Sequence, residues 1–171
     1  MIRNFEDKIP QLANGSFVAE TALVLGNVRI GKDSSIWYGA VIRGDVHYIT
    51  VGDSTNIQDC CAVHVTTDTH PTCIGDQVTI GHGAIIHGCV IGGQVLVGMG
   101  AIIMDGVEVK EGSVVAAGAL LPPGRCYPAK SLIVGAPAEV KRPVTSEELS
   151  WIRNSADHYV ALARRYAALI P

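Results

Sequence analysis

The chain has 171 residues, of which 48% are hydrophobic and 17% are charged, and its formal net charge at pH 7 is −3. This apolar composition excludes a disordered chain, and the weakly acidic charge makes a nucleic acid an unexpected partner. No apolar run approaches the roughly 20 residues that span a bilayer, and the first residues lack the apolar core of a secretory signal. We therefore expect a single cytoplasmic domain over residues 1–171 that does not engage membranes.

The composition favours strands built from small aliphatic side chains. Valine and isoleucine together number 37, against 10 leucines, and β-branched residues suit pleated, buried strands. Five cysteines are odd in number and lack C-x-x-C spacing, so neither a disulfide framework nor a thiolate zinc site is indicated. We expect buried free thiols at these positions, which are Cys60, Cys61, Cys73, Cys89 and Cys126.

A six-residue repeat organises residues 18–121. Valine or isoleucine begins every unit, and the fifth residue of each unit is small; the units start at 18, 24, 30, 36, 42, 51, 57, 63, 74, 80, 86, 91, 97, 103, 109 and 115. Each hexad predicts a short strand that cannot bury its own face, so the strands must stack. The pattern resembles the hexapeptide-repeat, left-handed parallel β-helix, which is a triangular prism with three hexads per coil.

The residues that follow the repeat predict a segment that closes the β-helix and then one α-helix. Pro122-Pro123-Gly124 should stop the coil, and residues 122–144 form an irregular closing segment. Thr145 and Glu148 have the spacing of a capping box, and apolar residues follow at helical spacing. The expected fold class is therefore all-β, a β-helix over 18–121, with a C-terminal amphipathic α-helix over 145–169.

Four of the six histidines lie between residues 64 and 87. If the extra residues after Val63 loop outward, the hexads at 63, 74, 80 and 86 occupy faces A, B, C and A of the prism. His64 and His87 are then both second in a hexad of face A, one coil apart, at about the 4.8 Å spacing of neighbouring strands. Two imidazole nitrogens at this spacing can bind one metal ion.

His82 is third in its hexad on face C, so its side chain should leave from a different wall. If three prisms pack side by side, His82 of one subunit can face His64 and His87 of the next, which gives three equivalent sites in a homotrimer. Three imidazoles with an open fourth position are the ligand set that lowers the pKa of zinc-bound water to about 7. Zn²⁺ is the expected cofactor, and Fe²⁺ or Co²⁺ would also accept imidazole.

Four segments resemble the gamma-class carbonic anhydrases and their close homologues: VIRGDVHY (41–48), TNIQDCCAVHV (55–65), VTIGHGAIIHGC (78–89) and VGMGAIIMDG (97–106). The resemblance implies reversible hydration of carbon dioxide to bicarbonate by a metal-bound hydroxide. It also implies that His64, His82 and His87 are the metal ligands. Gln58 matches the family glutamine that orients the hydroxide, a task suited to a side chain that both donates and accepts.

The same resemblance assigns the remaining candidate residues. Arg43, Asp45 and Asp59 match family ion pairs at the subunit interface, where the arginine fork suits a carboxylate. Asn56 matches a position near the site. Tyr159 matches a tyrosine near the metal, although packing of the helix explains this residue equally well.

The sequence departs from the well-studied active form at its acidic loop. Val46 follows the RGD segment, and Thr66-Thr67 follow the first histidine, where that form carries glutamates that assist proton transfer. Proton removal would then use buffer, water chains or His70, and hydration would be slow or absent. His70 can equally be a loop hydrogen bonder or a bystander.

Two other functions remain open on the same fold. One is an acyltransferase or thioesterase that uses acyl-CoA, with a histidine such as His70 as the base. The other is a non-catalytic trimer stabilised by its metal.

Overall fold

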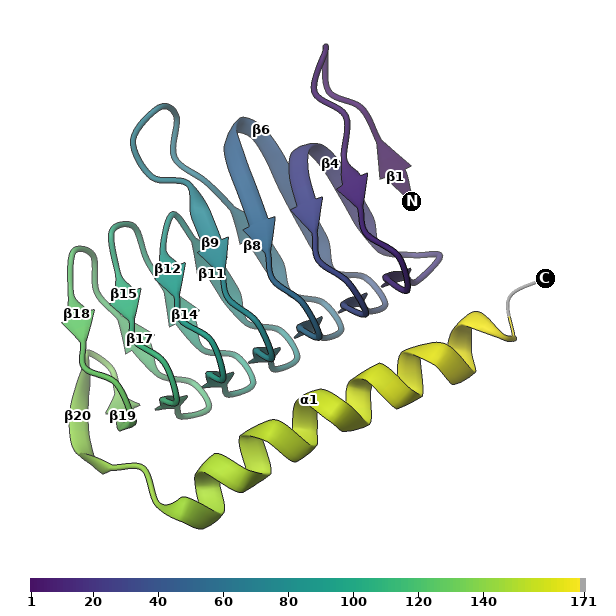
Figure 1. Ribbon diagram of the computed structural model, residues 1–171. Coiled ribbons are helices and arrows are strands. Elements are labelled where there is room, and N and C mark those ends of the chain that lie inside the picture. Colours follow the sequence, from purple (N-terminus) through teal and green to yellow (C-terminus); the bar gives the residue numbers. More distant parts are fainter. Residues whose placement is uncertain (170–171) are drawn as a thin grey trace.

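Successive hexads stack as parallel strands into a β-solenoid, with one long helix along its side (Figure 1). The computed structural model describes residues 1–169. The solenoid has three faces, since a twelve-stranded sheet bends to form faces A and B and an eight-stranded sheet forms face C. The expected fold class, a parallel β-helix with a C-terminal α-helix, is confirmed.

Two long strands bend across the corner between faces A and B, β4 (Leu23–Ile30) and β6 (Val41–Val51). The other strands of face A are β1 (Ile2–Arg3), β8 (Ala62–His64), β11 (Ile85–His87), β14 (Ile102–Ile103) and β17 (Leu120–Leu121). Those of face B are β2 (Gln11–Leu12), β9 (Thr72–Ile74), β12 (Val90–Ile91), β15 (Glu108–Val109) and β18 (Cys126–Tyr127).

Face C carries the helix. Its strands are β3 (Phe17–Val18), β5 (Ser35–Ile36), β7 (Asn56–Ile57), β10 (Thr79–Ile80), β13 (Leu96–Val97), β16 (Val114–Val115) and β19 (Ser131–Gly135). The strand β20 (Ala138–Pro143) pairs antiparallel with β19 and ends the sheet.

The first residue of each hexad fills the core. On face A, Val63, Ile86 and Ile103 are in register on neighbouring strands, and each is at most 1% exposed. Because successive side chains of a strand point to opposite sides, a slip of one residue would expose this whole row. The buried row therefore fixes the register, and it places the next residues, His64 and His87, together on the outside.

The parallel pairing extends beyond residues 18–121 at both ends. Strands β1 and β2 pair with β4, and β18 and β19 add to the stack after β17. The expectation that Pro122-Pro123-Gly124 stops the coil is wrong. These residues form a turn at a corner of the solenoid, where Gly124 donates its N–H to the Asp105 carbonyl at 2.9 Å. The missing N–H groups of the prolines therefore cost the stack no ladder hydrogen bond.

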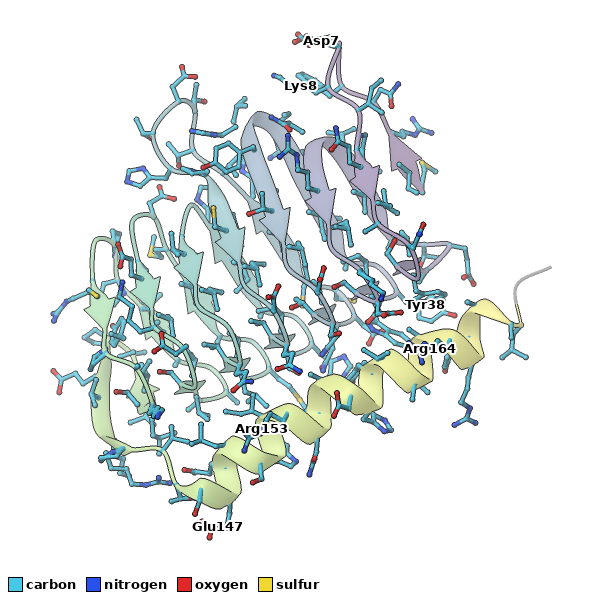
Figure 2. All side chains as sticks on the ribbon, viewed as in Figure 1. Asp7, Lys8, Tyr38, Glu147, Arg153 and Arg164 are labelled. Atoms are coloured by element: carbon cyan, nitrogen blue, oxygen red, sulfur yellow. The ribbon has the colours of Figure 1, made fainter. Side chains whose placement is uncertain are left out.

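The helix α1 (Ser146–Ala167) is slightly shorter than the expected 145–169, because Thr145 is its N-cap and Ala168 its C-cap. It runs back along face C against β3, β5, β7 and β10 and buries Ile152, Ala156 and Ala163. Near its C-terminal end, Tyr38 and Arg164 lie between the helix and the first coils (Figure 2), where Arg164 pairs with Asp33 at 3.2 Å. Within residues 1–169, no helix is both long and apolar enough to cross a membrane.

The five cysteines differ in burial, so the expectation that all are buried is wrong. All five are free thiols, but only Cys61 and Cys89 are buried, whereas Cys60 and Cys126 are exposed. Cys126 precedes the inward-facing Tyr127 on β18, so the alternation of the strand turns it outward. Burial raises the pKa of Cys61 to about 11 and that of Cys89 to about 12, which keeps both thiols protonated.

Candidate metal centre

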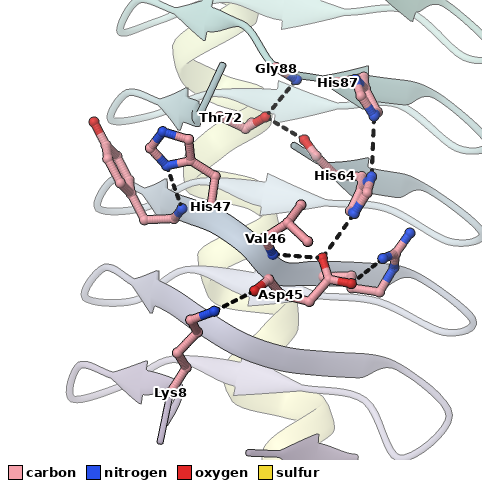
Figure 3. A network of polar contacts seen from close by, with 10 residues as sticks. Lys8, Asp45, Val46, His47, His64, Thr72, His87 and Gly88 are labelled. Carbon is pink, nitrogen blue, oxygen red and sulfur yellow. Dashed lines mark hydrogen bonds and ion pairs between the residues drawn. The ribbon is translucent and has the colours of Figure 1, made fainter. Parts of the chain in front are cut away.

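His64 and His87 lie side by side on face A (Figure 3). They are paired residues of β8 and β11, and the Nδ1 atom of His64 is 3.2 Å from the Nε2 atom of His87. Thr72 ties the two strands together beneath them, since its hydroxyl donates to the His64 carbonyl at 2.6 Å and accepts from Gly88 N at 2.9 Å. The stacking expected from the repeat is present.

A carboxylate contacts each of these two histidines. Asp45 Oδ1 is 3.0 Å from His64 Nε2, and the other oxygen of Asp45 pairs with Arg43. Asp105 Oδ1 is 2.6 Å from His87 Nδ1, and its other oxygen accepts from the Thr66 hydroxyl at 2.8 Å. Burial raises the pKa of each aspartate, but hydrogen bonds from the neighbouring histidine and from Arg43 or Thr66 outweigh it, so both pKa values are lowered. Both carboxylates are therefore ionised at neutral pH.

His82 lies at a different corner of the solenoid, in the turn between β10 on face C and β11 on face A. Its Nδ1 atom is 2.8 Å from Oδ2 of Asp59, which occupies the same position one coil earlier. Among residues 1–169 of this single chain, no three His, Cys, Asp or Glu side chains gather closely enough to hold a metal ion. One chain thus presents a histidine pair at the corner between faces A and B, and a single histidine at the corner between faces C and A.

A cavity of about 440 Å³ lies beside His82, between face C and α1. Its walls are mostly apolar and include Val97, Met99 and Trp151, while Gln58 and His82 also line it. The volume and the few polar groups are typical of a small-molecule pocket.

Gln58 is held rigidly at this cavity. It is 5% exposed, and its Nε2 atom donates to Asn56 Oδ1 at 3.2 Å. Asn56 in turn donates to Thr79 Oγ1 at 2.9 Å, and Thr79 Oγ1 is 3.2 Å from the hydroxyl of Ser155 on α1. The Asn56 Nδ2 atom also donates to the Val78 carbonyl at 3.4 Å, and a carbonyl can only accept. The Asn56 oxygen therefore faces Gln58, and the end of the Gln58 amide that meets it is the nitrogen.

The packing role expected for Tyr159 is present, and its proximity to a metal stays a prediction. Its ring packs edge-on against Trp37 with centroids 5.4 Å apart, and the residue also lines the cavity. Burial raises the pKa of its hydroxyl, so it is a neutral donor at physiological pH.

The structure therefore divides the expected site residues into two groups. Arg43, Asp45, His64 and His87 lie at the corner between faces A and B. The second group lies at the corner between faces C and A or over face C, and consists of Asn56, Gln58, Asp59, His82 and Tyr159. The chain does not bring the two groups together by itself.

Asp105, Thr66, Thr79 and Ser155 are polar residues of these clusters that were not among the sequence candidates. Asp105 could have been found, because the repeat places it one coil after Gly88 and so beside His87. The positions of Thr66 and Thr79 beside these clusters depend on the geometry of a loop and of a corner, which the repeat alone does not predict. Ser155 carries no signal, because hexad spacing says nothing about where the helix docks. The Nδ1 atom of His70 is 3.0 Å from Thr69 Oγ1, a local loop hydrogen bond.

Comparisons with known proteins give close relatives. The chain is 46% identical over 172 aligned residues to "Gamma carbonic anhydrase 1, mitochondrial" of Arabidopsis thaliana, covering 98% of this chain and 62% of that protein. It is 48% identical to a "Probable carbonic anhydrase" of Methanocaldococcus jannaschii, over 85% of this chain and 91% of that one. The chain thus spans less than two thirds of the plant relative's length. No family model matches it.

The solved structures agree on the fold. A hexapeptide transferase family protein from Anaplasma phagocytophilum matches with a TM-score of 0.93 and 43% sequence identity, covering 97% of this chain and 98% of that one. The match includes the coils that carry both histidine corners.

Proposed function

This chain belongs to the gamma carbonic anhydrase family of hexapeptide-repeat proteins, and on that basis we propose that it catalyses the reversible hydration of carbon dioxide to bicarbonate. The proposal places three metal sites between the subunits of a homotrimer. His64 and His87 of one subunit and His82 of another would hold each ion, which is Zn²⁺, Fe²⁺ or Co²⁺.

The observation that carries this proposal is the 3.2 Å separation of the His64 and His87 nitrogens. Two imidazoles that bind one tetrahedral zinc ion at about 2.0 to 2.1 Å have their nitrogens about 3.3 Å apart. The pair thus fits two ligands of such an ion before it arrives. At His82 and His87 the Nδ1 atom faces a carboxylate, which leaves Nε2 available as the ligand atom.

The outer side of face A supports the trimer. An apolar stripe of Val41, Ile85, Ile102 and Leu120 lies on β6, β11, β14 and β17, and Val41 and Ile85 are 38% and 42% exposed. This stripe lies between the corner of His82 and the corner of His64 and His87. A second copy packed against it would bury apolar surface and complete the ligand set at the same time.

The surrounding residues have distinct tasks in this proposal. A bound metal supplies a Lewis acid and lowers the pKa of a bound water. Gln58, fixed by Asn56, orients the attacking group, and the apolar walls of the cavity suit carbon dioxide, which is itself apolar. Asp59 orients His82, and the Arg43–Asp45 pair stands at the subunit boundary.

The direct test is carbon dioxide hydration by stopped flow on protein loaded separately with Zn²⁺, Co²⁺ or Fe²⁺. We expect activity that a chelator removes and that added metal restores. Hydration at the rate of the buffer alone, by a trimer with full metal content, would contradict the proposal.

A second candidate is acyl transfer from acyl-CoA, which the likeness to a hexapeptide transferase family protein favours. It predicts heat on titration with acetyl-CoA and release of free thiol with an acceptor present. Absence of both signals would exclude acyl transfer from acyl-CoA as the function.

A further inference from the structure

We propose that Asp105 is a positioning residue that fixes the ring and the proton of His87 for metal binding, an inference that rests on the function proposed above. Asp105 follows β14, and the pairing of Ile103 with Ile86 brings it one coil after Gly88. From there its Oδ1 atom reaches His87 Nδ1 at 2.6 Å.

The carboxylate of Asp105 is itself held from the other side. Its Oδ2 atom accepts from the Thr66 hydroxyl at 2.8 Å. Thr66 is anchored in turn by its backbone, since its N–H donates to the His70 carbonyl at 3.0 Å. Both oxygens of Asp105 are therefore committed, and the carboxylate has little freedom to rotate away from His87.

Two other aspartates at the corners of the solenoid, Asp53 and Asp76, are used differently. Asp53 Oδ1 accepts from the backbone N–H of Lys32 at 2.7 Å, and Asp76 Oδ1 accepts from that of Asp53 at 2.8 Å. These contacts join one coil to the next and are a structural use of aspartate. The two oxygens of Asp105 instead contact the side chains of His87 and Thr66. The difference separates Asp105 from a corner residue that only stabilises the stack.

The position of the proton on His87 follows from this contact. An ionised carboxylate can only accept, so the Nδ1 atom that faces it carries the hydrogen. The neutral ring then has its lone pair on Nε2, the atom that points to His64. Metal-binding histidines commonly donate their other N–H to a carboxylate, and loss of such a partner weakens metal binding about 10- to 100-fold.

The first measurement is the tautomer of His87 in the metal-free protein, read from long-range ¹H–¹⁵N correlations of ¹⁵N-histidine-labelled chain above pH 7.5. We expect the Nδ1–H form in the wild type and a shift toward Nε2–H in Asp105→Ala. Asp105→Asn should restore the Nδ1–H form, because the amide oxygen still accepts. The Nε2–H form in the wild type would overturn the proposal, and this arm does not depend on whether any variant folds.

The second measurement is the dissociation constant for Zn²⁺, from competition with a chromophoric chelator. We expect Asp105→Ala to weaken binding 10- to 100-fold and Asp105→Asn to stay within a few-fold of the wild type. The matched control is Asp76→Ala, which removes a corner aspartate without a histidine partner and should leave the constant unchanged. Equal losses in Asp105→Ala and Asp76→Ala, or no loss in either, would overturn the positioning role.

His87→Ala separates this inference from the proposed function. If the site is assigned correctly, His87→Ala removes Zn²⁺ binding. Unchanged binding in His87→Ala would refute the metal site itself. Lost binding in His87→Ala together with wild-type binding in Asp105→Ala would refute only the role of Asp105.

Discussion

The ring nitrogens of His64 and His87 approach each other to 3.2 Å because the two residues are paired across neighbouring strands of face A. This contact is a consequence of the core beneath it, where Val63 and Ile86 fix the register. The fold of one chain thus brings together two of the three histidines of the proposed metal site. The remaining histidine of the proposed ligand set, His82, lies at the opposite end of the face and is available to a neighbour.

Removing His82 should abolish metal binding while the solenoid stays folded. The His82 side chain is 43% exposed and its polar contact is with Asp59, so His82→Ala leaves no cavity in the core. We expect metal content to fall from about one ion per chain to near zero, with an unchanged far-UV circular dichroism spectrum. His158→Ala, which removes an exposed histidine of α1, is the control and should retain the metal. A His82→Ala protein with full metal content would contradict the assignment of His82 as a metal ligand.

A charge on the apolar stripe of face A should prevent formation of the proposed trimer. Ile85 is 42% exposed in the single chain, and Ile85→Asp would bury a carboxylate without a partner in the proposed interface, at a cost of several kcal/mol. We expect sedimentation at the mass of a single chain and a parallel loss of metal binding, since each proposed site takes its ligands from two subunits. Val90→Asp places the same charge at a residue of face B that is 45% exposed and should remain trimeric. Trimeric Ile85→Asp would move the interface to another face.

Much of the fold and half of the site can be predicted from the sequence because the repeat is strict. Hexad spacing determines the face on which each residue lies, so the pairing of His64 with His87 follows from the sequence alone. The same arithmetic fails at Pro122-Pro123-Gly124, where the prolines predict a stop although a corner needs no N–H from them. The position at which α1 packs on the solenoid cannot be predicted from the repeat either, because Trp37 and Tyr159 meet through tertiary packing. For the same reason, the contact between the Thr79 and Ser155 hydroxyls cannot be predicted from hexad spacing.

The stability of the helix N-terminus should depend on acid pH through Glu148. Hydrogen bonds from Arg142 lower the pKa of Glu148 to about 2, with a further contribution from the Thr145 backbone. A pKa lowered on folding means that the ionised group stabilises the native chain above the ordinary pKa of 4.5, and that this contribution disappears as the pH falls toward 2. We expect Glu148→Gln to be less stable than the wild type at pH 7, by no more than about 1 kcal/mol because the pair is exposed.

The measurement for Glu148 is urea unfolding of both proteins between pH 7 and pH 2. The difference in unfolding free energy should shrink steadily below pH 4.5 and vanish near pH 2. Added salt at pH 7 should also reduce it, because exposed ion pairs are screened. A difference that is constant with pH would assign the effect to the lost hydrogen bond instead of the charge.

Alanine at Gly88 should harm both the stability of the chain and the candidate metal centre. Its φ is +54°, and an added Cβ would lie 2.2 Å from Asp105 Oδ1 and 2.8 Å from the Cβ of His70. Gly118 has a similar φ of +67° but no atom within 4 Å of such a Cβ. Both substitutions carry the strain of a left-handed backbone, about 1 to 2 kcal/mol, so Gly118→Ala reports that strain alone. Gly88→Ala should lose more unfolding free energy and should also weaken Zn²⁺ binding, because the new methyl group pushes Asp105 away from His87. Equal losses of stability in the two variants, with Zn²⁺ affinity intact in both, would show that Asp105 can shift without consequence for the site.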